Sequence, residues 1–365
     1  MTPDRADWLV MREDRTPRWG GEIRRHHIFS RLAERTGAQI LEGGWSDAGL
    51  RRATLGPLRA RLPMWLSTRS ARSRLPRLAA SEKLREKTLA SAILLADPAV
   101  VAIYDDPIAQ AATLGVTLDP AWAATLRRRQ RANREAFRWQ VVPTASFADL
   151  AGLDPDRVIV GGNGADTARV HVGPWPERAT IGMVSGAAPG RGIELLVNAA
   201  EIARQTISEL ELRLWLVATN EETAAYLEGI RKSVAREPWI KIGGAPYGQL
   251  GETLAEATIL VIPHPPGAYM DVALPVKLFD SLAAGRPLVI TPRRESAAIV
   301  REFGVGIVAG GDTAEDLARA MVALLSDPVR ARSMGVVARA VAEREFDWRV
   351  VGDRIADEVL RREGA

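Results

Sequence analysis

The sequence predicts an α/β protein built from two Rossmann-like parallel-sheet domains. Apolar runs typical of buried strands alternate with helix-like segments along most of the chain, and glycine-rich or polar turns follow several of the strands. The 365 residues are 47% hydrophobic and 26% charged, which favours two buried cores over one. We therefore expect two domains that each carry a parallel sheet and that face each other across a cleft.

The composition excludes several classes of function. The chain has no cysteine, which rules out disulfides, thiolate metal sites and thiol catalysis and suits a reducing compartment. Its four histidines show no metal-ligand spacing, so we expect no structural metal. The N-terminal residues lack a charged leader before an apolar run, and the most apolar stretches are interrupted well short of a bilayer span. We therefore expect a cytoplasmic protein that does not cross a membrane.

The N-terminal half is expected to open with a strand, a glycine turn and a helix. An apolar run at Trp8–Met11 fits the strand, Gly20-Gly21 the turn, and Glu22–Arg35 the helix. The two glycines let the start of the helix approach a bound group closely, although a simple tight turn is the alternative. Later elements are expected as a strand at Ala99–Ile103 that leads to Asp105, a helix capped by Ser146, and a strand at Val158–Val160.

A linker separates two series of elements. Residues Gly161–Asp166 form a glycine-rich joint, and Arg169–Arg178 contain two prolines without periodicity. A strand at Thr180–Val184 and a turn at Ser185–Gly192 then precede a helix at Ile193–Gln205, which is either a phosphate-binding turn or only a tight turn. Further strands are expected at Leu212–Ala218, Trp239–Ile242, Ile259–Ile262, Leu288–Ile290 and Gly306–Val308, and helices at Glu221–Ala235, Gln249–Ala257, Val276–Ala284, Asp316–Leu325 and throughout the chain after Asp327.

The residues between Thr258 and Thr291 carry the strongest candidate site. A buried strand is followed by a polar loop with His264 and Asp271, and ligands bind to loops at the C-terminal ends of parallel strands. Pro275 fits the first position of the helix that follows. We therefore expect the start of this helix to face the loop.

Lys277 and Asp280 lie three residues apart and so share one face of that helix. Lys277 is beside the free N–H groups of the first turn, which attract anions, and Asp280 lies one turn deeper. A phosphate and a hydroxyl could both be held there. The alternative is an exposed salt bridge within the helix.

The formal net charge of +4 is modest, but one segment is strongly basic. Residues Arg51–Lys87 have only Glu82 and Glu86 as acids and an apolar centre at Met64–Leu66. Such a segment can rest on an anionic lipid surface. A solvated, arginine-rich excursion is the plainer alternative. Nucleic acid is a third, but no binding motif accompanies the charges, so we expect no nucleic-acid partner.

Several motifs together resemble the nucleotide-sugar-dependent glycosyltransferases of the GT-B fold, in particular the retaining group called family 4 or group 1. The resemblance covers roughly Ser146 to Ile355 and rests on Asn163–Asp166, the Gly186–Gly192 turn, Leu274–Asp280 with Ala283–Val289, and Phe346–Trp348. It implies an acceptor-binding domain of residues 1–165, on which residues 346–365 pack back, and a nucleotide-sugar-binding domain of residues 166–345.

The resemblance also implies roles for individual residues. Arg191 and Lys277 match the basic positions that neutralise the donor diphosphate in relatives, and the N–H groups near Val276 add the field of a helix start. Asp280 matches an acid that accepts hydrogen bonds from the nucleotide ribose. The remaining expected site residues are Gly20, Gly21, Gly186, His264 and Leu274 around the donor, Asp271 as a catalytic acid, and Asp105 at a strand end near the acceptor.

The implied activity is transfer of a sugar from a nucleotide-diphosphate donor to a hydroxyl of a glycan, a lipid-linked molecule or a small metabolite. Retention of configuration is implied, and no metal or other cofactor. Two departures from the family pattern leave an alternative open: Ala187 stands where the turn usually has an arginine, and the first acid of the carboxylate pair is displaced by one position to Asp271. The alternative is a protein that binds nucleotide sugar or glycan without turnover.

Overall fold

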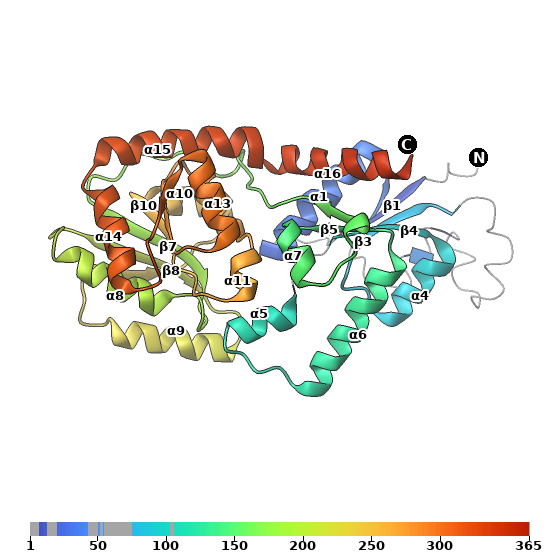
Figure 1. The fold of residues 1–365 in the computed structure, drawn as a ribbon, viewed down its shortest axis with the longest axis horizontal. Coiled ribbons are helices and arrows are strands. Elements are labelled where there is room, and N and C mark those ends of the chain that lie inside the picture. The colour runs from blue at the N-terminus through green and yellow to red at the C-terminus, as the bar shows by residue number, and fades with distance from the viewer. Residues whose placement is uncertain are drawn as a thin grey trace. The chain divides into compact units, whose positions relative to one another are not determined.

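The computed structural model describes residues 7–12, 20–42, 50–51, 54, 75–102 and 106–364, and these form two compact units. Unit 1 comprises the described residues within Met1–Ile108, Leu118–Gly162 and Trp348–Ala365. Unit 2 comprises Ala109–Thr117 and Asn163–Asp347. Each unit contains a six-stranded sheet with helices packed on it (Figure 1).

The sheet of unit 1 has the strand order β2-β1-β3-β4-β5-β6, and every neighbouring pair is parallel. Its central strands are almost entirely apolar and buried, which is expected when helices cover both faces of a parallel sheet. The strands are β1 (Trp8–Arg12), β2 (Gln39–Glu42), β3 (Arg77–Ser81), β4 (Asp97–Ala102), β5 (Trp139–Val142) and β6 (Val158–Val160), and the helices of eight or more residues are α1 (Gly20–Thr36), α4 (Glu86–Leu95), α6 (Pro120–Ala136) and α16 (Trp348–Glu363). Shorter helices are α5 (Pro107–Thr113), which runs into unit 2, and α7 (Ala145–Leu150).

Helices α1 and α16 lie side by side in unit 1 (Figure 1). Gly352 permits their close approach, because a Cβ on this residue would lie 2.7 Å from the Cβ of Arg31. Arg31 also donates to both carboxylate oxygens of Asp353, at 2.7 and 2.9 Å. The last helix of the chain is therefore part of the fold of unit 1.

The sheet of unit 2 has the order β12-β11-β10-β7-β8-β9, again parallel throughout. Apolar residues on its two faces pack into two core clusters beneath the helices. The strands are β7 (Thr180–Gly186), β8 (Glu211–Val217), β9 (Ile240–Gly243), β10 (Ile259–Ile262), β11 (Leu288–Ile290) and β12 (Gly306–Val308). The helices are α8 (Ile193–Arg204), α9 (Glu221–Ser233), α10 (Leu250–Ala255), α11 (Ala268–Val272), α12 (Val276–Ala283), α13 (Arg294–Phe303), α14 (Ala314–Leu325) and α15 (Pro328–Val341).

The predicted α/β class with two parallel sheets is confirmed, but four local predictions are wrong. Gly20 and Gly21 are the first residues of α1 and do not form a separate turn before it. The cap of α7 is Thr144, whose Oγ1 accepts from the backbone N–H of Phe147 at 3.0 Å, and not Ser146. Pro275 has an extended conformation and precedes α12, so it is not the first helical residue. Phe346, expected to open the segment that packs back on the first domain, instead packs against Phe279 in unit 2, and the last helix begins only at Trp348.

Candidate active site

Two strand-to-helix turns meet at the C-terminal ends of the strands in unit 2. Strands β7 and β10 are parallel neighbours, so the turns that follow them lie at the same end of the sheet. Gly192, at the end of the first turn, has φ +76°, and a Cβ on it would lie 1.8 Å from the carbonyl oxygen of Pro263 in the second. Only glycine fits this position, since it needs both the left-handed backbone and the missing side chain. The turn between β7 and α8 is therefore packed directly against the loop that follows β10.

Two helices begin at this end of the sheet without a side-chain cap. The residues before them are Gly192 for α8 and Pro275 for α12, and neither side chain accepts a hydrogen bond from the first turn. The first N–H groups of a helix have no partner within the helix and carry a partial positive charge. Both helix starts can therefore take part in anion binding.

Lys277 reaches from the first turn of α12 to the end of β7. Its Nζ donates to the Oγ of Ser185 at 3.2 Å. Burial lowers the pKa of Lys277 well below its ordinary value, and the positive charge of Arg191 lowers it further. Arg191 is thus near enough for its charge to act on Lys277, and two basic groups in one place favour a bound anion.

His264 is the buried centre of this basic group. Its side chain is 2% exposed, and its Nε2 is buried without a hydrogen-bond partner among the described residues. The backbone oxygen of His264 accepts from the Oγ1 of Thr291 at 2.6 Å. Burial lowers the pKa of His264 well below its ordinary value, as do the charges of Lys277, Arg191 and Arg293. The imidazole is therefore in its neutral form at neutral pH.

Asp271 lies in α11, where the sequence predicted a loop. It accepts from the Nη1 of Arg293 at 3.4 Å, and the same arginine is hydrogen-bonded to Asp312. Arg293 is nine-tenths buried and ties α11 to the loop after β12. Sequence reasoning missed Arg293, although its place directly after β11 could have indicated it, since loops after parallel strands carry ligand-binding groups.

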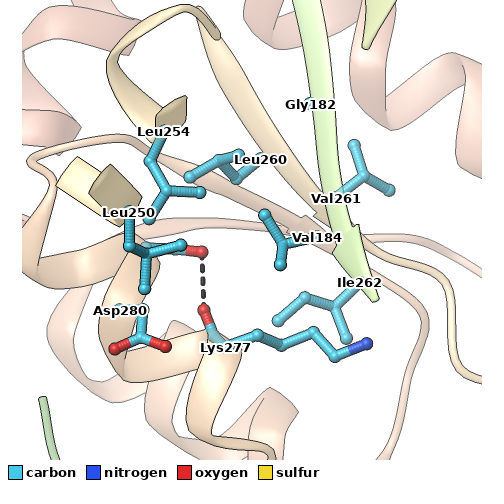
Figure 2. Close-up of a pocket in the computed structure, with 10 residues that line it drawn as sticks. Gly182, Val184, Leu250, Leu254, Leu260, Val261, Ile262, Lys277 and Asp280 are labelled. Carbon is cyan, nitrogen blue, oxygen red and sulfur yellow. Dashed lines mark hydrogen bonds between the residues drawn. The ribbon is translucent and has the colours of Figure 1, made fainter. Parts of the chain in front are cut away.

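Asp280 faces a small, mostly apolar pocket, and its carboxyl points away from the ammonium group of Lys277 (Figure 2). No ion pair joins these two described residues, so the alternative of a salt bridge within the helix is wrong. The pocket has a cavity volume of about 20 Å³, which is room for roughly one or two water molecules. Burial raises the pKa of Asp280 to about 8, and the nearby charge of Asp166 adds to the effect. The pocket is lined by Gly182, Val184, Leu250, Leu254, Leu260, Val261, Ile262, Lys277, Asp280 and Ser281.

The other predicted site residues are only partly brought together. The carbonyl of Leu274 accepts from the Nδ2 of Asn163, so the joint after unit 1 holds the loop before α12, a contact that the sequence did not reveal. Val276 is buried in the first turn of α12, and Gly186 is exposed, with open space where a Cβ would be. Gly20 and Gly21 belong to unit 1.

Two sequence predictions concern residues outside the described part of the chain. These are the predicted role of Asp105 and the apolar centre of the basic segment at Met64–Leu66. Among the described residues, no group of histidine, aspartate and glutamate side chains has the arrangement of a metal site. No helix in this part of the chain is both long and apolar enough to span a bilayer.

The comparisons with known proteins begin with a family model. The model described as "Glycosyl transferases group 1" matches residues 178–327. The chain is 26% identical over 234 residues to the GDP-mannose-dependent alpha-(1-6)-phosphatidylinositol monomannoside mannosyltransferase of Mycolicibacterium smegmatis, which covers 62% of this chain and 59% of the relative. It is 29% identical over 118 residues to the GDP-mannose-dependent monoacylated alpha-(1-6)-phosphatidylinositol monomannoside mannosyltransferase of Corynebacterium glutamicum, covering 32% of this chain and 31% of the relative. The match thus spans less than two thirds of either curated relative.

Solved structures share the fold over nearly the whole chain. The structure of Anabaena HepE in complex with UDP has a TM-score of 0.68 at 14% identity and covers 97% of this chain and 100% of that one. Sucrose-phosphate synthase from Thermosynechococcus elongatus has a TM-score of 0.69 at 12% identity, with 98% and 99% covered. WaaG, a glycosyltransferase involved in lipopolysaccharide biosynthesis, has a TM-score of 0.65 at 14% identity, with 96% and 99% covered. At these identities the likeness concerns the fold alone, and it confirms the GT-B class.

Proposed function

We propose that this protein, whose residues 178–327 belong to the group 1 glycosyl transferases, moves a sugar from a nucleotide-diphosphate donor to an acceptor hydroxyl. One observation supports the proposal most strongly. Lys277 and Arg191 lie near two uncapped helix starts at the C-terminal end of the strands in unit 2. Departure of a nucleoside diphosphate develops negative charge, and fixed positive groups at that point lower the barrier most effectively. We further propose retention of configuration and independence from a metal.

The proposed role of each group follows from its place. Lys277 and Arg191 neutralise the leaving diphosphate together with the N–H groups of α8 and α12. Gly186 leaves room for close passage of a phosphate, because nothing lies within 4 Å of the position of its missing Cβ. Asp280 receives the ribose hydroxyls, and the Nε2 of His264 meets a polar group of the donor. Asp271 forms an ion pair with Arg293, so we propose that this pair holds α11 in place.

The names of the relatives suggest the first substrates to try. Both curated relatives are described as GDP-mannose-dependent enzymes that act on phosphatidylinositol monomannosides, and the HepE structure contains UDP. GDP-mannose is therefore the first donor to test, with UDP-sugars second. A lipid-linked glycan is the first acceptor class.

A second candidate function is binding of a nucleotide sugar without turnover. It is favoured by two observations: Ala187 is fully buried and apolar where the family pattern leads us to expect an arginine, and Asp271 is ion-paired with Arg293. Fewer charges around the leaving group would slow the chemistry more than they would weaken binding.

Binding and turnover separate the two candidates. Thermal unfolding of the full chain with GDP, UDP, ADP and TDP tests the donor site, since a ligand at one hundred times its dissociation constant adds about 2.7 kcal/mol of stability. If none of the four shifts the midpoint, the donor-site proposal fails. If one shifts it but the matching nucleotide sugar is neither transferred nor hydrolysed, the second candidate replaces the first.

A further inference from the structure

Helix α6 packs against β4 and the start of α4 in unit 1 (Figure 1). The buried Asn133 of α6 donates from Nδ2 to the carbonyl of Leu84 at 3.0 Å. Leu84 follows Ser81, the last residue of β3, by three positions. This contact brings the last turns of α6 close to the C-terminal end of β3, and ligands of parallel sheets bind at the C-terminal ends of the strands.

A buried carboxylate lies at that end of β3. Glu82 is 3% exposed, and its Oε2 accepts from the Oγ of Ser81 at 3.1 Å. Within the described part of the chain this is the only hydrogen bond of the carboxylate, and no ion pair compensates its charge. A carboxylate can accept about four hydrogen bonds, and burial without them is costly. Glu82 therefore has hydrogen-bonding capacity that the fold does not use.

Arg134 of α6 supplies the opposite charge. Its Nη1 donates to the carbonyl of Ala151 at 3.3 Å, whereas its Nε and Nη2 are buried without a hydrogen-bond partner among the described residues. Burial lowers the pKa of Arg134, and the negative charges of Asp106 and Glu82 act against this shift. The guanidinium is thus near enough to both carboxylates to feel their charges, yet no ion pair joins Arg134 to Glu82.

Gln130 adds a carboxamide to this group. It lies four residues before Arg134, so the two side chains share one face of α6. Gln130 is 9% exposed, and its amide forms no hydrogen bond within the residues that the structure describes. Arg134 and Asp106 are only half-buried, so the group can be reached from solvent. Donors and acceptors without partners therefore occur together at one accessible place.

We propose that Glu82, Gln130 and Arg134 hold the hydroxyl groups of a neutral polyhydroxylated ring, such as a sugar. A hydroxyl group can donate to Glu82 while it accepts from Arg134, so one such group satisfies both side chains. A phosphate would match Arg134 but would be repelled by Glu82 and Asp106. We assign the ring to the part of the acceptor that does not react, and this assignment rests on the proposed function.

Ligand-observed NMR with the full chain tests the site without a donor. The neutral probes are methyl α-mannopyranoside and myo-inositol, and the anionic probe is mannose 6-phosphate. The wild type is expected to bind the neutral probes in a saturable way. Binding of mannose 6-phosphate should not depend on Glu82, because the carboxylate repels an anion.

The test variants are Glu82→Gln and Arg134→Gln, which remove the two charges. The matched controls are Glu86→Gln and Arg131→Gln, at exposed positions four and three residues away. All variants are first compared with the wild type in melting temperature, and Glu82→Gln should melt no lower, because it removes a buried charge that has no ion pair. Gln130→Met is a milder third variant, which keeps the test decisive if a charge-removing variant does not fold.

Glu82→Gln and Arg134→Gln should each raise the dissociation constant of the neutral probes about tenfold or more, because each loses a hydrogen bond to a charged group. Gln130→Met should raise it less, and the controls should bind like the wild type. No binding of the neutral probes would show that only water occupies the group and would overturn the inference. Equal effects of test and control variants would also overturn it.

Steady-state transfer assays separate this inference from the proposed function. Glu82→Gln should raise the KM for the acceptor and leave the KM for the donor unchanged, since the donor groups lie in unit 2. Transfer with an unchanged acceptor KM would overturn the inference while the proposed function stands. Probe binding that depends on Glu82 in a protein without transfer activity would support the site and contradict the proposed function.

Discussion

The Nζ of Lys277 lies 3.2 Å from the Oγ of Ser185, so a cation from the first turn of α12 is held at the C-terminal end of β7. The two residues are 92 positions apart in the chain. They meet because β7 and β10 are parallel neighbours and α12 begins after the loop that follows β10. Four predictions follow from this site, each with its own measurement.

Replacing Lys277 with methionine should lower the transfer rate about 100-fold to 1000-fold, because a fixed positive group near the leaving diphosphate is lost. Stability should stay constant or increase, since methionine fills a similar volume without a buried charge. Steady-state kinetics and urea unfolding measure the two effects. Lys232→Met on α9, where the side chain is 76% exposed, serves as the control and should change neither quantity. An unchanged rate in Lys277→Met means that this residue does not stabilise the leaving group.

Binding of GDP or UDP should take up protons in alkaline buffer. Burial and Arg191 hold the pKa of Lys277 well below its ordinary value, and a diphosphate beside the ammonium group raises it again. The phosphate groups are already fully ionised above about pH 8, so they contribute no compensating change. Calorimetric titration in buffers of different ionisation enthalpy measures the uptake. Lys277→Met should remove it, and uptake that persists in this variant would assign the proton elsewhere.

Gly192→Ala should destabilise the protein by at least about 2 kcal/mol. The left-handed backbone alone costs a non-glycine residue about 1–2 kcal/mol, and the new Cβ would overlap the carbonyl oxygen of Pro263. Gly186→Ala is the matched control, since its Cβ would meet nothing within 4 Å. It should leave stability unchanged but weaken donor binding if a phosphate passes over this residue. Urea unfolding and nucleotide titration of both variants give the answer, and equal stability of the two would contradict the geometry.

Asp280→Asn should be more stable than the wild type in alkaline solution. The pKa of Asp280 is about 8 in the folded protein against an ordinary value of 3.8. Between these values the folded protein holds a proton that the unfolded chain has released, so wild-type stability falls as pH rises through this window. The variant lacks this loss and should exceed the wild type by at least about 1 kcal/mol at about pH 9, with little difference near pH 4. Urea unfolding at several pH values tests it, and parallel curves for the two proteins would show that the carboxyl is not perturbed.

The strands of unit 2 could be predicted closely from the sequence. The bounds of β10, β11 and β12 are as predicted, and α12 differs by one residue, because short apolar runs between turn residues specify buried parallel strands. The helix starts were less predictable: Gly20 and Thr144 begin or cap helices in ways that depend on local hydrogen bonds. Periodicity carries no information about such bonds.

The charges of the site were predictable in kind but not in arrangement. The resemblance to the family assigned Arg191 and Lys277 to one donor diphosphate, and each of them adjoins a helix start after a strand. The pairing of Arg293 with Asp271 and the burial of His264 could not be predicted, because they depend on how loops of variable length fold over one another. The sequence pattern predicts at which end of the sheet a loop lies. Which residues the loop contacts there depends on side-chain packing.

The position of Glu363 has a consequence for the order in which the protein folds during synthesis. Its side chain is 4% exposed and binds Arg77 of β3 and Arg138 and Trp139 around the start of β5. Unit 1 begins the chain yet closes only after the final helix has left the ribosome, whereas unit 2 can finish earlier. We expect nascent chains that end before Trp348 to contain a folded second unit and an N-terminal sheet that still exposes apolar surface to chaperones.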